Sequence, residues 1–426
     1  MRYSHSSPTR KVAQILLYLA PYQFLHIQYS RDDNMVALSH LVRAASTLTV
    51  VLYNAVPATE VKAYLTAHES NGAIRMLSED GTWFDPCSTR SGAAGTQPIP
   101  AATITHHLGA QGSYFGLEIP VPVTSGRMYF VTDGDLEFGT TGPSAGGFCP
   151  LQEPSALNMG EASAHRSWGF MEFSYRNELL FVNPTLVDFV GTPLSVRMET
   201  PDGNLDARGL PTNAVDLICH GLAAKAKDEH GIPWHKLCVH RQDGSPLRVL
   251  SPSHYKEADI PILDTYWEEH VDAVWNAYRS KPLKVNTQGD HGVVPCQVHG
   301  DVLVCDSESF AKPCSTDVFG CDSGPFANEG SPLRRALASR LCAAFHRTTL
   351  LGAGGDKQPA VGVERYYTTS PSNWYSKLVH EHAIDGNGYA FPYDDITAPG
   401  KKDRSGTLSH ANPQKLVIGV GGPLPG

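Results

Sequence analysis

The chain reads WGFMEFSYR over residues 168–176 and LLFVNPTLVDFVG over residues 179–191. Both segments are rich in aromatic and β-branched residues, which is typical of β-strands. Each nevertheless carries a carboxylate, Glu172 in the first and Asp188 in the second. Strands are depleted in Asp and Glu, and burial raises the pKa of an acid because it disfavours the charged form. Two carboxylates in different surroundings therefore indicate acid–base chemistry.

Alternation along the first segment places Glu172, Ser174 and Arg176 on one face of a strand and Met171 and Phe173 on the other. A turn at residues 177–178 is expected to lead into the second segment. A single acid on the polar face of a half-buried strand is common, so Glu172 could simply face water beside Arg176. The residues alone leave both readings open.

The regions around these segments predict an α+β fold. Strand-like stretches occur at residues 47–53, 61–65, 115–121 and 127–131, and many short strands of this kind indicate a sandwich or barrel. After residue 202 the pattern changes to mixed α/β. Helical periodicity is found at 214–229, 266–279 and 332–345, while 249–250 and 293–305 look extended.

Several strings resemble glycoside hydrolase family 64, the β-1,3-glucanases that release short laminari-oligosaccharides such as the pentaose. The first two are MEFSY (171–175) and FVNPTLVDFVG (181–191). Others follow in the family's order: WHKL (234–237), RVLSP (248–252), DVFGCDSGPF (317–326), AAFHRTTLL (343–351) and HEHAIDGNGYAFPYDD (380–395). The resemblance extends from about residue 46 to the end, and this coverage makes it specific.

The resemblance implies a fold and two catalytic roles. Glu172 would be the general acid and Asp188 the general base of an inverting hydrolysis. A thaumatin-like β-barrel or sandwich would span residues 46–200, a mixed α/β domain would be inserted at 201–375, and residues 376–426 would return to the barrel through the strand-like segment 415–420. A wide groove would separate the two parts.

The resemblance also implies sugar-contacting positions, which correspond here to Ser174, Arg176, Phe181 and Thr185. Ser174 keeps a hydroxyl where the family usually has Thr. Arg176 and Phe181 depart from the expected Asn and Trp, so the affinity of their subsites is expected to differ while the catalytic pair is preserved.

The pair Asp394 and Asp395 follows a proline and aromatic residues that would hold both acids in a rigid loop. The resemblance implies that this loop lies near the groove, where carboxylates suit sugar hydroxyls. Capping of a turn is the alternative. His380 and His382 cannot share one helix face, so we expect no metal site there and no cofactor.

Composition fits a glucanase without demonstrating one. The 426 residues are 41% hydrophobic and can bury substantial cores, while charged residues make up 18% and the net charge is −9. Because there is no basic excess, the sequence indicates neither a nucleic-acid nor a membrane partner. We expect a monomer acting on neutral β-1,3-glucan. The alternative is a thaumatin-like protein that binds β-glucan without cleaving it, and retention of both Glu172 and Asp188 favours the enzyme.

The termini and cysteines bear on localisation. Arg10 and Lys11 precede an apolar run at 12–20 that has the polarity of a signal peptide, but the run is poorly formed. Residues 1–45 are therefore expected to be an atypical leader or a disordered arm, and the resemblance implies an extracellular protein. Nine cysteines would allow up to four disulfides and one free thiol, and Cys314 with Cys321 could close a small loop. Buried free thiols are the alternative.

Overall fold

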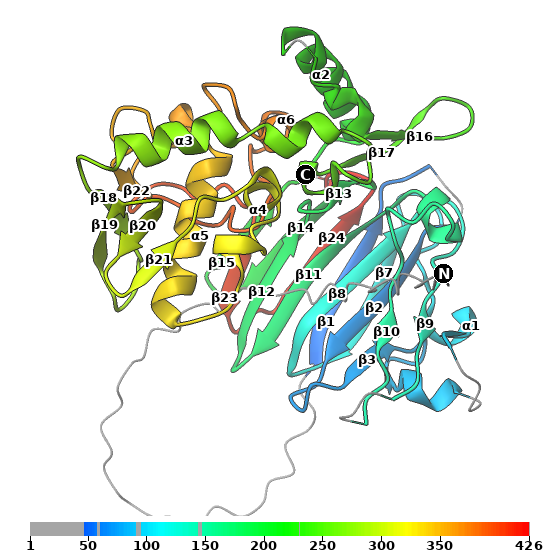
Figure 1. Cartoon of the computed structure of the whole chain (residues 1–426). Coiled ribbons are helices and arrows are strands. Elements are labelled where there is room, and N and C mark those ends of the chain that lie inside the picture. Colours follow the sequence, from blue (N-terminus) through cyan, green and yellow to red (C-terminus); the bar gives the residue numbers. More distant parts are fainter. Residues whose placement is uncertain (1–46, 58–59, 91–94, 144–146, 230, 426) are drawn as a thin grey trace, which may run out of the picture.

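Two β-sheets packed face to face carry the segments around Glu172 (Figure 1). The structure is a computed structural model and describes residues 47–425 except 58–59, 91–94, 144–146 and 230. The expected leader or arm at residues 1–45 lies outside the described residues.

The first sheet has five strands in the spatial order β15 (Gly203–Ala207), β14 (Leu194–Thr200), β24 (Lys415–Val420), β1 (Thr47–Asn54) and β7 (Tyr114–Pro120). The second has eight, ordered β23 (Leu408–Ala411), β12 (Leu179–Pro184), β11 (Trp168–Arg176), β8 (Val123–Val131), β2 (Lys62–His68), β3 (Ile74–Leu77) and β4 (Trp83–Phe84), with β6 (His106–His107) paired to β2. A small three-stranded sheet lies beside them, formed by β10 (Leu151–Gln152), β9 (Gly139–Thr140) and β5 (Gln97–Pro98).

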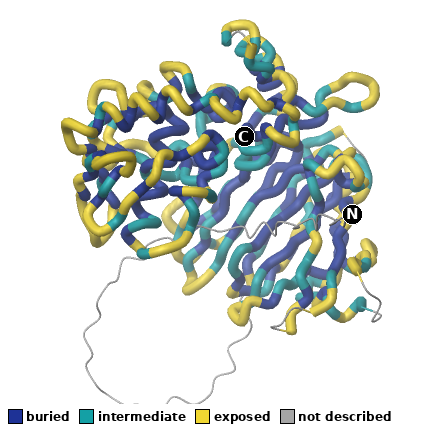
Figure 2. Tube along the Cα trace, in the orientation of Figure 1, coloured by how far each residue is buried: buried dark blue, intermediate teal, exposed yellow. Residues whose placement is uncertain are grey.

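Alternation in these strands sends one set of side chains into a core between the two sheets. Met171 and Phe173 of β11 are buried in this core with Val50 of β1 and Ile418 of β24, as expected for their face. Figure 2 shows long buried stretches along the strands of the two sheets. Burying each such side chain stabilises the fold by about 1.5–3 kcal/mol. Gly126 of β8 lies opposite Phe173, and a side chain there would collide with the Phe173 ring. The other face of β11, which carries Glu172, points away from this core.

The last described strand, β24, closes the first sheet. It pairs in parallel with β1 and antiparallel with β14, so it lies in the middle of that sheet. β23 similarly joins the second sheet through β12. The predicted strand at 415–420 is therefore confirmed, and the chain does return to its first strands.

Between β15 and β23 the chain forms a mixed section of helices and two small sheets (Figure 1). One sheet contains β17 (Pro246–Leu250) and β16 (Cys238–His240), and it is joined by β13 (Phe189–Val190), which comes earlier in the chain, just before β14. The other contains β21 (Glu308–Phe310), β20 (Val302–Cys305), β19 (Val293–His299), β18 (Leu283–Asn286) and β22 (Lys357–Gln358). The α-helices of this section are α2 (Ala214–Asp228), α3 (Glu268–Ala277), α4 (Ser315–Gly320), α5 (Pro332–His346) and α6 (Trp374–His382).

Shorter elements complete the chain. One short α-helix, α1 (Ala101–Ile104), precedes β6. The 3₁₀ turns are η1 (Pro86–Thr89), η2 (Ala162–His165), η3 (Trp234–Leu237), η4 (Pro252–His254), η5 (Pro261–Thr265), η6 (Gly324–Phe326) and η7 (Val363–Arg365). All three predicted helices are found, as α2, α3 and α5. Every described helix is too short or too polar to cross a lipid bilayer.

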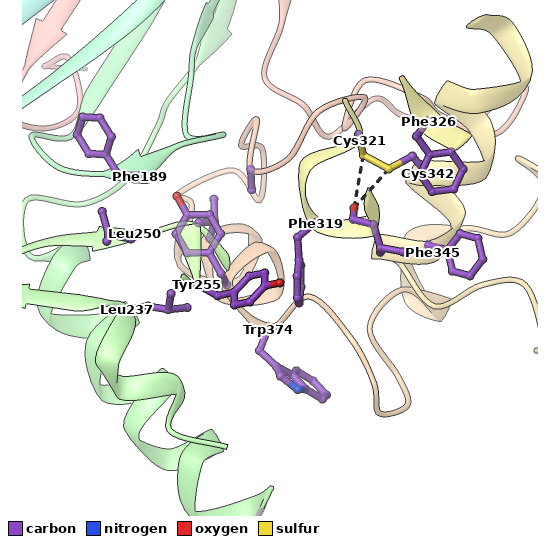
Figure 3. Packing of buried hydrophobic residues seen from close by; sticks show 14 of the residues in the cluster. Phe189, Leu237, Leu250, Tyr255, Phe319, Cys321, Phe326, Cys342, Phe345 and Trp374 are labelled. Atoms are coloured by element: carbon purple, nitrogen blue, oxygen red, sulfur yellow. Dashed lines mark hydrogen bonds between the residues drawn. A yellow bond between two sulfur atoms is a disulfide. The ribbon is translucent and has the colours of Figure 1, made fainter. Parts of the chain in front are cut away.

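A second core fills the mixed section and reaches back to the start of β11. Figure 3 shows Tyr255 and Phe319 between Phe189 on one side and the Cys321–Cys342 disulfide on the other. Four disulfides are present, Cys87–Cys149, Cys219–Cys238, Cys296–Cys305 and Cys321–Cys342, and Cys314 is free. The suggested Cys314–Cys321 pair is wrong because Cys321 bonds to Cys342 on helix α5.

Candidate active site

Glu172 lies in the interior of the second sheet, where strands pair with β11 on both sides. Its register partners are Arg127 on β8 and Asn183 on β12. The β11–β12 hairpin turns at Asn177 and Glu178, whose φ angles of 50° and 63° suit the tight turn favoured in hairpins. The turn was predicted, and it fixes the register that brings Asn183 beside Glu172.

The Glu172 carboxyl is poorly solvated. Its side chain is 14% exposed, and Arg127 Nε lies 3.5 Å from its Oε1. Burial raises the pKa of Glu172 to about 6, Arg127 acts to lower it, and the charges of Asp188 and Glu153 act to raise it further. The alternative in which Glu172 simply faces water beside Arg176 is therefore wrong, because the carboxyl is largely buried beside Arg127.

Arg127 is itself shared with a second acid, Glu153. Arg127 Nη1 contacts Glu153 Oε2, and the Tyr129 hydroxyl donates to Glu153 Oε1 at 2.5 Å. The Arg127 side chain is only 10% exposed. These three residues were not predicted, because their proximity depends on the register of β8 against β11 and on the segment after β10 folding over the sheet.

Asp188 lies just before β13, in the connection that follows β12. Its backbone carbonyl accepts a hydrogen bond from the Ser251 amide at 2.8 Å. The adjacent Phe189 packs edge-on against Trp168 at the start of β11, with ring centroids 4.7 Å apart. Gly191 approaches so closely that a side chain there would collide with the Trp168 carbonyl. The Asp188 segment is thus tied both to β11 and to the mixed section.

The Asp188 side chain is 39% exposed and has His254 as a neighbour. His254 Nε2 lies 3.5 Å from Asp188 Oδ1, which is within ion-pair range although it lacks hydrogen-bond geometry. Burial raises the pKa of Asp322, and the charges of Asp317 and Asp188 raise it further. The hydroxyl of Tyr375 donates to the Leu186 carbonyl at 2.6 Å. Three groups of the mixed section, His254, Asp322 and Tyr375, therefore interact with Asp188.

The predicted sugar-contacting positions occupy the Glu172 face and its continuation. Ser174 lies directly opposite Phe181 across the β11–β12 pair, and both are partly buried. Arg176 is exposed at the end of β11 and lines a hollow of about 710 Å³ at the turns of both sheets. Thr185 is buried and forms a β-bridge with Tyr389. The contact of these four residues with sugar stays a prediction.

The two loop acids differ in their surroundings. Asp394 is fully buried, and it accepts hydrogen bonds from Arg347 Nη2 at 2.9 Å and from the Ala390 amide at 3.0 Å. Burial alone would raise its pKa, but His380, 3.0 Å away, and Arg347 hold that pKa below the usual value. Its contacts fix the loop internally, as in the turn-capping alternative. Asp395 is partly buried and accepts from the Tyr389 hydroxyl at 3.1 Å.

Of the two histidines considered for metal binding, His380 contacts Asp394. Among the described residues, Cys321, Cys342 and His346 form a group with metal-ligand atoms close together, but the two sulfurs of this group form a disulfide.

A buried acid with a raised pKa on a strand face, near a more exposed carboxylate whose charge raises that pKa further, is typical of glycoside hydrolases. The model of the family described as β-1,3-glucanase, glycoside hydrolase family 64, matches residues 46–420. The chain belongs to this family.

Individual relatives are similar along most of the chain. The glucan endo-1,3-beta-glucosidase of Cellulosimicrobium cellulans is 27% identical over 382 residues, which are 86% of this chain and 65% of that protein. The chain thus spans just under two thirds of the length of this curated relative. A laminaripentaose-producing β-1,3-glucanase in complex with laminaritetraose is 25% identical, with a TM-score of 0.74 over 88% of this chain and 98% of that one. The β-1,3-glucanase domain from Clostridium beijerinckii, at 19% identity and a TM-score of 0.68, covers 88% of this chain and 98% of its own and shares the fold.

Proposed function

We propose that this chain hydrolyses β-1,3-glucan internally by an inverting mechanism and releases short laminari-oligosaccharides, with laminaripentaose as the expected main product. Glu172 donates its proton to the glycosidic oxygen as that bond breaks. Asp188 takes a proton from a water molecule, whose oxygen attacks the anomeric carbon from the opposite face. The observation that carries the proposal is the burial of Glu172 on the strand face, which raises the pKa of its carboxyl.

The surroundings of Glu172 support its role as acid. A general acid must hold its proton near the working pH, and a pKa of about 6 achieves this in mildly acidic solution. The more exposed Asp188 has access to water, which a general base needs.

Unused polar atoms near Glu172 support a polar ligand on this face. Arg127 Nη2 and Asn183 Oδ1 are buried and have no hydrogen-bond partner among the described residues. Buried polar atoms are rarely left unpaired, and sugar hydroxyls both donate and accept hydrogen bonds. Ser174, Arg176, Phe181, Thr185 and Asp395 are proposed to contact further sugar rings. Asp394 was predicted to contact sugar as well, but because it is fully buried we propose that it positions this loop instead.

The proposal extends to architecture and location. We infer that the two packed sheets form the thaumatin-like part and that the mixed section, expected at residues 201–375, is an insertion that runs from the end of β15 to the start of β23. We further infer that the glucan lies in a groove between the two parts. Return of β23 and β24 to the first sheets supports this division. Four disulfides support an extracellular protein, because such bonds persist in oxidising compartments.

Incubation of the protein with laminarin or curdlan tests the activity. We expect oligosaccharides, with the pentaose prominent, and an α-anomer as the first product seen by proton NMR. A β-anomer would show that Asp188 acts as a nucleophile or that the acids are misassigned. Binding to the glucan without any products would instead support the non-catalytic alternative.

A further inference from the structure

Arg127 is buried between two carboxylates on the second sheet. Its Nη1 contacts Glu153, while its Nε lies 3.5 Å from Glu172. Glu153 is also held by the Tyr129 hydroxyl, at 2.5 Å. The guanidinium therefore interacts more closely with Glu153 than with the proposed acid.

This arrangement matters because a cation beside a carboxylate stabilises its charged form and can lower its pKa by about 1–3 units. A proton donor next to an unshared arginine would lose its proton too readily. Burial of Glu172 opposes this effect of Arg127 and is the largest contribution to its raised pKa, and the charge of Glu153 acts in the same direction. A second anion on the far side of the guanidinium thus also counters the effect of Arg127.

We propose that Glu153 is a positioning residue whose carboxylate engages Arg127 and thereby keeps Glu172 able to hold its proton for transfer to the leaving oxygen. This inference rests on the proposed role of Glu172. Glu153 itself is not required to touch the substrate, and it acts through Arg127.

The other titratable groups around this network have clear effects. Asp188 approaches from the connection before β13, and its charge, like that of Glu153, raises the pKa of Glu172. Tyr129 on β8 stays neutral, since burial holds its pKa well above the usual value. Asn183 on β12 and Thr66 on β2, the register partners of Glu172 and Arg127, are uncharged. Glu153 is thus the anion that shares Arg127 with Glu172.

The variant Glu153→Gln tests this role because it removes the charge at nearly constant volume. We expect the fall of kcat at high pH to begin about 1 unit lower than in the parent protein, as released Arg127 favours the Glu172 carboxylate. With the parent pKa of about 6, activity at pH 7 should drop about tenfold and activity at pH 4.5 less than twofold. A loss that is equal at all pH values would indicate a merely structural role and overturn the proposal.

Two companion variants sharpen the test. Arg127→Gln should move the fall of kcat at high pH, the alkaline limb of the pH profile, to higher pH, which is opposite in sign to the effect of Glu153→Gln. It also provides the test if the Glu153→Gln protein does not fold. Tyr129→Phe, the matched control, removes a hydrogen bond to Glu153 while all charges remain, so its limb should shift by no more than about 0.3 unit. Shifts of the same sign for the Arg127 and Glu153 variants, or no shift with Arg127→Gln, would contradict the inference.

A readout without substrate separates this inference from the proposed function. The pKa of Glu172 follows from the difference in unfolding free energy between proteins with and without Glu172→Gln, measured against pH. In the Glu153→Gln background this pKa should be lower by the same amount as the kinetic limb. Inactivity of the parent protein on glucans would defeat the proposed function, whereas an unchanged Glu172 pKa would defeat the role of Glu153.

Discussion

The two acids occupy contrasting parts of the molecule. Glu172 lies within a strand that is hydrogen-bonded on both sides, and its side chain is 14% exposed. Asp188 lies in a connection between strands, is 39% exposed, and has His254 of the mixed section as its neighbour. The sheet thus shields the Glu172 carboxyl from water, whereas the Asp188 carboxyl, at the junction with the mixed section, stays accessible to water. Similar side chains acquire different chemistry from the rigidity and solvation of their surroundings.

Replacing Glu172 with Gln should have the largest effect. The amide keeps the shape but cannot supply a proton, so kcat on laminarin should fall by a factor on the order of hundreds or more while glucan still binds. A laminari-oligosaccharide with a dinitrophenyl leaving group needs no proton and should be cleaved nearly as well as by the parent. Near-normal hydrolysis of laminarin by the folded variant would disprove the assignment of the acid.

Asp188→Asn should reduce activity by a factor on the order of a hundred on both substrates, because activation of water is needed whatever the leaving group. Comparing the two substrates therefore distinguishes the acid from the base. If the dinitrophenyl substrate restored activity to the Asp188→Asn protein, the roles of the two carboxyls would have to be exchanged.

The pH dependence of stability should also reveal the contrast. The folded-state pKa of Glu172, about 6, lies above its ordinary value of 4.5. Folding therefore disfavours the charged form, and the free energy of unfolding should decrease by up to about 2 kcal/mol as the pH rises from 4.5 through 6. Chemical denaturation should show that Glu172→Gln lacks this contribution. An identical pH dependence in both proteins would mean that Glu172 is better solvated than its burial indicates.

The smallest effect is expected for His254→Asn. Its ring lies 3.5 Å from the partly exposed Asp188 carboxylate, so its loss should cost at most about 1 kcal/mol of transition-state stabilisation, or about fivefold in kcat, with KM little changed. A change confined to KM would place His254 in substrate binding instead.

The sequence predicted the parts of the site that lie close together along the chain. Alternation correctly separated the buried Met171 and Phe173 from the face that carries Glu172. The turn at Asn177 and the strand at residues 415–420 were also predicted from local patterns.

Contacts between distant segments could not be predicted in this way. Arg127 and Glu153 meet Glu172 only through the pairing of β8 with β11 and the course of a loop, neither of which has a periodic signature. The pairing of Cys321 with Cys342 likewise depends on the packing of helix α5. Burial of Asp394 depends on Arg347, which is far from it in the sequence.

The central place of β24 in the first sheet has a consequence for biosynthesis. Its neighbours β1 and β14 are translated long before it, and both present unpaired backbone groups until residues 415–420 emerge from the ribosome. Such distant pairings form slowly, and exposed strand edges promote aggregation of nascent chains. We therefore expect the sandwich to fold only after β24 has been made, with chaperones shielding its incomplete sheet until then.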